Sequence, residues 1–225
     1  SQKKKYDIIY NARLEPIKRH YLLNKCKNIS LISAPIFNVD HYKKEYFETI
    51  KEKISEAEIL NFNPPIKIKE FQINNVFHHL TPSEVCDAIN RAKVGVILSA
   101  KEGACYASVE YLLCGLPVVS TINEGGRDVF FDKRFCRVVP SNPTAINDAV
   151  NELIQTDYSP NLIRQETLKK FEPHTQRMKS LIKDIYDKKQ FKYFNYDQLW
   201  SKQYINKMIK YAQPFPEALI QDLKF

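Results

Sequence analysis

Short runs of apolar and β-branched residues alternate along this chain with longer stretches that have helical periodicity. The short runs predict strands, at residues 6–10, 29–34, 66–71, 76–78, 94–99, 117–121 and 136–139. The longer stretches predict helices, at residues 16–26, 41–57, 81–92, 104–114 and 143–155. Strands that alternate with helices in this way predict an α/β fold, a Rossmann-like doubly wound parallel sheet, followed here by C-terminal helices.

Capping residues mark the ends of two of these helices. Thr81 is a suitable N-cap, Pro82 suits the first helical position, and Glu84 completes a capping box. Gly115 follows the 104–114 helix at a C-cap position. Beyond residue 156, amphipathic patterns predict helices at 160–171, 173–189 and 198–212, so we divide the chain into domains at 1–188 and 189–225.

The net charge of +8 favours an anionic partner, such as a phosphate-bearing small molecule, a membrane surface or nucleic acid. No nucleic-acid-binding motif accompanies the charge, so we expect no nucleic-acid partner, although a basic nucleic-acid-binding α/β domain remains an alternative. The chain has no signal-peptide pattern and no run of the roughly 18 to 20 apolar residues that span a bilayer. Its five cysteines are scattered. These features predict a cytoplasmic protein, which could associate peripherally with the inner membrane face.

Ligands of open parallel sheets bind beyond the carboxyl ends of the strands, and three loops there carry suitable residues. The first loop places Arg13 and Lys18 at the start of a predicted helix, where they could bind a diphosphate or could be ordinary surface cations. The second loop has small residues from Gly103 to Ala107 between Glu102 and Glu110. Free helix amides suit a phosphate, and ionised carboxylates suit sugar hydroxyls, although Glu110 could equally pair with a surface lysine.

The third loop contains Gly125 and Gly126, which permit either close ligand contact or an ordinary turn. The adjacent His78 and His79 have no third metal ligand nearby, and we expect no metal site. Each signal is weak by itself. All three loops follow predicted strands at their carboxyl ends, and this shared position supports a ligand site there more strongly than any one loop does.

Taken together, these motifs resemble the retaining glycosyltransferases of the GT-B fold, in the family of glycosyl transferases group 1. The family's paired glutamates, its C-G-x-P-V-V turn and its G-G loop match Glu102, Glu110, residues 114–119 and Gly125-Gly126. Its G-R-L-x-x-x-K-G motif matches Arg13, Leu14 and Lys18, with Ala12 and Arg19 in place of the glycines. The resemblance covers residues 6–185, which correspond to the C-terminal, donor-binding half of such an enzyme.

The resemblance implies transfer of a hexose from a UDP-, GDP- or ADP-sugar to a glycan or other hydroxyl acceptor, with retention. It implies that Arg13 and Lys18 bind the diphosphate, that Glu102 binds the transferred sugar, and that Glu110 binds the ribose. Other residues implied to bind the donor are Gly103, Ala104, Cys105, Tyr106, Ala107, His79, Gly125 and Gly126. No cofactor is expected besides the donor substrate, and an N-terminal acceptor domain is the expected missing partner.

Three departures from the family pattern weaken individual assignments. Cys105 and His79 replace habitual glycines, and after the G-G pair the acid comes one position early, at Asp128. Two alternative functions stay open besides nucleic-acid binding. One is a non-catalytic sugar-nucleotide-binding module, which fits the absent acceptor domain, and the other is a sugar-nucleotide epimerase of the same fold, which the spacing of the two glutamates disfavours.

Overall fold

The computed structural model describes residues 3–34, 41–72 and 75–189. Contacts between Cα atoms divide the chain into two compact units, Ser1–Phe171 and Glu172–Phe225. The predicted helix at 198–212 and nearly all of the predicted extension at 189–225 lie outside the described residues, so the domain boundary at 188 stays a prediction. None of the helices in the described ranges is long and apolar enough to cross a bilayer.

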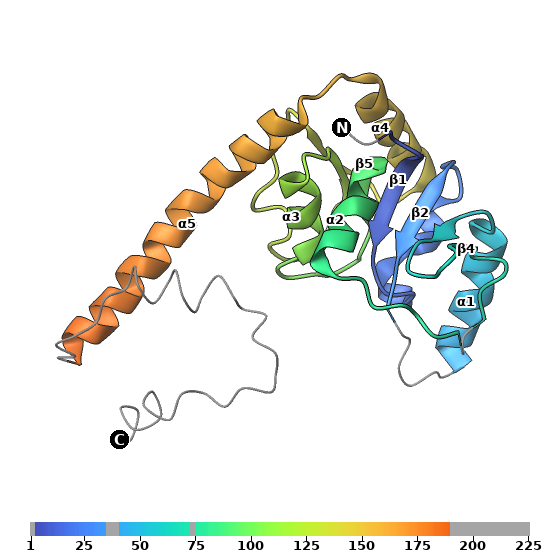
Figure 1. Ribbon diagram of the computed structural model, residues 1–225, viewed down its shortest axis with the longest axis horizontal. Coiled ribbons are helices and arrows are strands. Elements are labelled where there is room, and N and C mark those ends of the chain that lie inside the picture. The colour runs from blue at the N-terminus through green and yellow to red at the C-terminus, as the bar shows by residue number, and fades with distance from the viewer. Residues whose placement is uncertain (1–2, 35–40, 73–74, 190–225) are drawn as a thin grey trace. The chain divides into compact units, whose positions relative to one another are not determined.

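The first unit contains a seven-stranded sheet of strand order β4-β3-β2-β1-β5-β6-β7 (Figure 1). All strand pairs are parallel except β3 with β4. The strands are β1 Tyr6–Asn11, β2 Ile29–Ile32, β3 Glu58–Ile59, β4 Ile66–Lys67, β5 Ala92–Ile97, β6 Val118–Thr121 and β7 Cys136–Val139. The predicted fold class is confirmed. The strand order reverses direction between β1 and β5, which opens a crevice at their carboxyl ends.

Helices cover both faces of this sheet, as the doubly wound prediction requires. Helices α2 and α3 pack on the central strands from one face, and α4 packs on β5 and β6 from the other (Figure 1). The helices are α1 His41–Lys53, α2 Pro82–Asn90, α3 Tyr106–Leu113, α4 Pro143–Gln155 and α5 Pro160–Lys188. Consecutive residues of the central strands are therefore buried, such as Ile8 and Ile9 in β1.

The predicted caps of α2 and α3 are both present. The Thr81 hydroxyl accepts a hydrogen bond from the Glu84 amide, and the Glu84 carboxylate accepts one from the Thr81 amide. Gly115 ends α3 with a φ of 78°, a left-handed conformation that favours glycine. Glycine is also required sterically, because an added Cβ would lie 2.6 Å from the Pro160 carbonyl oxygen.

Thr81→Ala is expected to lower the free energy of unfolding by about 1 kcal/mol, because it removes the acceptor for a first-turn amide of α2. Ser83→Ala, a matched change at an exposed position of the same helix, is expected to change it by less than about 0.5 kcal/mol. Urea denaturation measures both values. Equal effects of the two changes would contradict a stabilising role for the capping box.

Five predicted elements are wrong in extent or kind, and one strand was not predicted. Instead of a helix at 16–26 there are two 3-10 turns, Pro16–Lys18 and His20–Leu23, separated by Arg19 with a φ of 52°. Residues 76–78 form no strand. β3 pairs with β2 on one side and with β4 on the other, so β4 occupies this edge of the sheet. β4 is only two residues long, and β3 was not predicted. The helices expected at 160–171 and 173–189 form one helix, α5, which contains Pro173.

Candidate functional site

A pocket of about 270 Å³ lies at the carboxyl ends of β1 and β5, in the crevice where the strand order reverses. The predicted site residues that line it are Arg13, Lys18, Glu102, Ala104, Cys105, Tyr106, Ala107 and Glu110. Its other lining residues are Tyr10, Asn11, Ala12, Ile97 and Ser99. The structure thus brings together side chains from the first two predicted loops. Gly103, His79, Gly125 and Gly126 are not among the lining residues.

Helix α3 begins inside this pocket. Its N-cap residue, Cys105, has an extended backbone and makes no side-chain cap, so the amides of the first turn, from Tyr106 onward, are not satisfied by a capping side chain. Burial raises the pKa of the Cys105 thiol, which keeps it neutral and unsuited to nucleophilic chemistry. An uncapped helix N-terminus in a pocket is a suitable place for a phosphate group.

The two predicted cations hold different positions at the pocket. Lys18 Nζ lies 2.9 Å from Glu102 Oε1, and both side chains are largely buried. Arg13 lies at the rim, where its side chain is 53% exposed and its guanidinium is 3.4 Å from Glu15. Lys18 is also fixed through its backbone, because its carbonyl accepts a hydrogen bond from the Tyr10 hydroxyl at 2.8 Å. The structure therefore presents one constrained cation and one adaptable cation.

Glu102 has one oxygen engaged and one available. Oε1 accepts the hydrogen bond from Lys18, whereas Oε2 is buried and has no hydrogen-bond partner among the residues that the structure describes. Burial is the largest influence and raises the pKa of the Glu102 carboxyl, but the side chains of Lys18 and Ser99 and the positive charges of Lys18 and Arg127 together outweigh it, so the net shift is downward. The carboxyl is therefore ionised at neutral pH, with an acceptor oxygen left for a hydroxyl group.

Glu110 lies eight residues after Glu102, in the second turn of α3, and its carboxylate is hydrogen-bonded to a residue of β1. Asn11 Nδ2 donates a hydrogen bond to Glu110 Oε2 at 3.2 Å. Burial raises the pKa of the Glu110 carboxyl in spite of this bond. The backbone amide of Asn11 in turn donates to the Tyr111 hydroxyl at 2.5 Å. The sequence analysis missed Asn11, although its position as the last residue of β1 was an available signal.

The G-G loop supports Glu102 from outside the pocket. The Glu102 amide donates to the Glu124 carbonyl at 3.3 Å, and Lys101 and Glu124 form a parallel bridge. Gly125 has a φ of 134°, and a Cβ added there would lie 1.9 Å from the Glu102 carbonyl oxygen. Gly126 is not constrained in this way, since its nearest contact would be Val129 at 3.6 Å. Donor contacts of these glycines stay a prediction.

Arg127 is a buried residue of this region that the sequence analysis missed. Its side chain is 2% exposed, and its guanidinium donates to the Ser99 carbonyl at 2.7 Å and to the Thr121 carbonyl. Ser108 of α3 donates to the Arg127 carbonyl at 3.3 Å. Arg127 thus joins the ends of β5 and β6 to the helix that begins in the pocket. Nothing in the sequence distinguishes it from a surface arginine.

Arg19 makes a second connection of the same kind. Its guanidinium donates to the Leu98 carbonyl at 2.6 Å, the Ser99 carbonyl at 3.2 Å and the Thr121 hydroxyl at 2.8 Å. These bonds fix Arg19 in its left-handed conformation and explain why the predicted helix at 16–26 is interrupted. A motif glycine replaced by arginine was the available signal.

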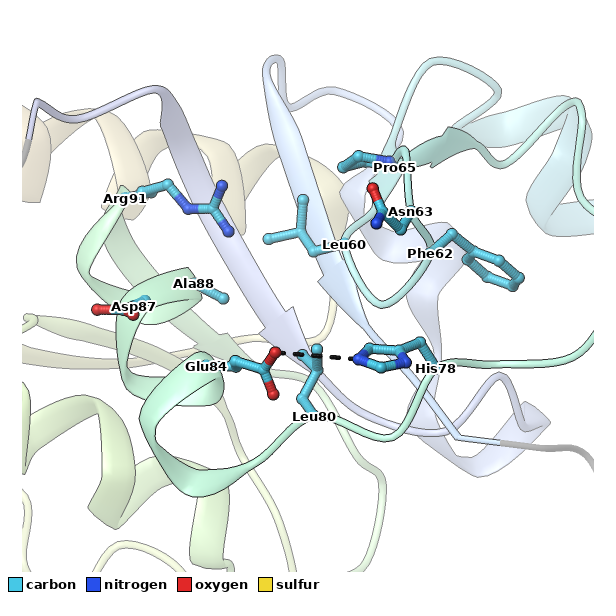
Figure 2. Close-up of a pocket in the computed structure, with 10 residues that line it drawn as sticks. All are labelled: Leu60, Phe62, Asn63, Pro65, His78, Leu80, Glu84, Asp87, Ala88 and Arg91. Carbon is cyan, nitrogen blue, oxygen red and sulfur yellow. Dashed lines mark ion pairs between the residues drawn. The ribbon is translucent and has the colours of Figure 1, made fainter.

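His78 lines a different pocket, of about 550 Å³, beside α2 (Figure 2). Its Nε2 lies 3.9 Å from Glu84 Oε1. His79 lines neither pocket, so its predicted position near a nucleotide base stays untested. Among the described residues, no group of three or more His, Cys, Asp and Glu side chains could hold a metal ion.

Comparison with known proteins gives a family match over part of the chain and a fold over most of it. Residues 66–171 match the family model of glycosyl transferases group 1. A search of curated proteins finds no significant match. Solved structures match across most of the chain, at identities that demonstrate the fold alone.

Three of these structures are representative. Anabaena Alr3699/HepE in complex with UDP matches at 15% identity and a TM-score of 0.58, over 80% of this chain and 49% of its own. A glycosyltransferase from Rickettsia africae matches at 16% identity and a TM-score of 0.56, over 86% and 49%. Sucrose-phosphate synthase from Thermosynechococcus elongatus matches at 14% identity and a TM-score of 0.54, over 80% and 45%. The chain thus spans about half the length of these proteins.

Proposed function

We propose that this chain, whose residues 66–171 match the family model of glycosyl transferases group 1, is the donor-binding half of a retaining hexosyltransferase. Its donor would be a nucleotide diphosphate sugar and its acceptor a hydroxyl compound, such as a glycan. The observation that carries this proposal is the composition of one pocket, where the uncapped start of α3 lies between Glu102 and Glu110. UDP in the HepE structure supports a nucleotide as the ligand.

The diphosphate would bind to the amides of Tyr106 and Ala107, with Arg13 and Lys18 as counter-charges. Negative charge grows on the leaving diphosphate as the glycosidic bond breaks. Fixed cations and helix amides therefore stabilise the transition state more than the ground state. The chain's own residues can supply this stabilisation without a further cofactor.

The two carboxylates would bind hydroxyl groups on either side of the diphosphate. Glu110, oriented by Asn11, would accept hydrogen bonds from the ribose. Glu102 would accept them from the transferred hexose through its unpaired Oε2. Support for these two roles comes from the position of both acids in one pocket, with Glu102 before the start of α3 and Glu110 within it.

Thermal-shift measurements with UDP-, GDP- and ADP-glucose test the proposal, because a ligand that binds only the folded state raises the melting temperature. We expect one of the three to raise it and the corresponding nucleoside to do so far less. No shift with any of them would contradict the proposal. Product formation in the presence of an acceptor-binding half separates a transferase from a binding module without activity.

Nucleotide-sugar affinity is expected to fall on acidification, by up to about tenfold per pH unit, once Glu110 protonates. Burial places this step above the ordinary pKa of 4.5, whereas Glu102, with its lowered pKa, stays ionised. The stability contribution of Glu110 has the opposite sign: it is present below pH 4.5 and is lost as the pH rises through the raised pKa.

Isothermal titration between pH 7 and pH 5 measures the effect on binding. Glu110→Gln serves as the control, because it removes the titrating group and keeps the size of the side chain. An identical pH dependence in the wild type and Glu110→Gln would exclude Glu110 as the source.

A further inference from the structure

A second pocket lies between α2 and the segments at residues 60–65 and 78–80 (Figure 2). It has a volume of about 550 Å³, in the range of small-molecule sites, and shares no lining residue with the proposed donor pocket. The chain at residues 76–78 runs outside the sheet, with Val76 88% exposed, and His78 of this segment lines the pocket.

Arg91, the C-cap residue of α2, supplies the most distinctive group of this pocket. Figure 2 shows its guanidinium turned toward Leu60, across the pocket from α2. Its Nε is buried and has no hydrogen-bond partner among the described residues. A buried N–H without an acceptor is costly, and a guanidinium matches the planar oxygens of a carboxylate.

Neither acidic residue of the pocket, Glu84 or Asp87, forms an ion pair with Arg91 among the interactions of the described residues. Glu84 already accepts hydrogen bonds from the amide and hydroxyl of Thr81 and lies 3.9 Å from His78. The carboxylate of Asp87 points away from the pocket in Figure 2. Half of the lining residues are apolar: Leu60, Phe62, Pro65, Leu80 and Ala88. The pocket therefore combines a cation, unpaired among the described residues, with an apolar part of its wall.

We propose that this pocket binds a small organic carboxylate with an apolar body, independently of the nucleotide-sugar site. Its carboxylate accepts hydrogen bonds from the Arg91 guanidinium, and its body packs on Leu80 and Ala88. An inorganic anion would leave these apolar walls hydrated, and a neutral apolar molecule would leave Nε without an acceptor. The charge and the apolar body are both needed.

Titration of the full chain with 4-fluorobenzoate, followed by its fluorine NMR signal, tests the proposal. We expect a dissociation constant of about 1 mM or tighter, because one charged contact and a ring of this size support binding of that order. The neutral isostere 4-fluorobenzamide and inorganic phosphate are each expected to bind at least about tenfold more weakly. Equal binding of 4-fluorobenzoate and 4-fluorobenzamide, or no binding of 4-fluorobenzoate at about 20 mM, would overturn the proposal.

Variants locate the binding. Arg91→Gln is expected to weaken 4-fluorobenzoate binding at least about tenfold, whereas Lys93→Gln, a matched loss of charge two residues away, should leave it unchanged. Lys93 pairs with Asp7 and does not line the pocket. Leu80→Phe, which places a larger side chain at a partly exposed lining position and keeps Arg91, should also weaken binding. It serves as a second test if Arg91→Gln folds poorly. Unchanged binding in both pocket variants would contradict the site.

Discussion

Glu110→Ala is expected to weaken nucleotide-sugar binding by about 30-fold, because it removes a half-buried acceptor worth about 2 kcal/mol of hydrogen bonding to hydroxyl groups. The same variant should weaken binding of the free nucleotide by a similar factor, since the ribose is common to both ligands. Isothermal titration with the nucleotide sugar identified by thermal shift, and with its free nucleotide, measures both losses. Glu48→Ala, an exposed change on α1, is the control.

Glu102→Ala should behave differently. Its predicted partner is the transferred hexose, so the variant should mainly remove the difference in affinity between nucleotide sugar and free nucleotide. The four dissociation constants of the two variants therefore separate the two roles. Equal losses for both ligands in both variants would contradict the assignments, even if each variant binds more weakly than the wild type.

Gly125→Ala is expected to lower the free energy of unfolding by about 3 kcal/mol or more, since the new Cβ meets backbone in a left-handed conformation. The clash is with the carbonyl oxygen of Glu102, which lies 1.9 Å from the position of that Cβ. Relief requires Glu102 to move. The variant should therefore also lose the preference for nucleotide sugar over free nucleotide, as Glu102→Ala does.

Gly126→Ala provides a matched control in the adjacent residue. A Cβ there meets only Val129, at 3.6 Å, so the free energy of unfolding should change by less than about 1 kcal/mol. Urea denaturation of both variants measures the difference. Equal stabilities would show that the G-G loop does not support Glu102, and weaker donor binding in Gly126→Ala alone would indicate direct contact with the donor.

The central strands could be predicted from sequence because burial on both faces leaves continuous apolar runs, as in β5 and β6. β3 has only two residues and leaves no such pattern. The helix expected at 16–26 failed for another reason. Arg19 adopts a left-handed conformation fixed by hydrogen bonds to Leu98 and Thr121, and the one local signal for it is the motif glycine that it replaces.

The candidate site divides in the same way. Glu102 and Glu110 could be selected from sequence because they lie in one segment with a small-residue loop between them. Asn11 was harder to select, since its partner Glu110 is 99 residues away and only its position at the end of β1 marks it. Arg127 also escaped prediction, because its partners are mainly backbone carbonyl oxygens, and acceptors of that kind are present at every residue.

Arg19 and Arg127 have a further consequence for how the region around the donor pocket opens. Both guanidiniums donate to the Ser99 carbonyl, and both donate to the Thr121 hydroxyl. The loops that follow β1, β5 and β6 are therefore linked through shared acceptors, and one cannot separate without breaking bonds to the others. Amide hydrogens of these loops would exchange with solvent as one cooperative unit rather than loop by loop.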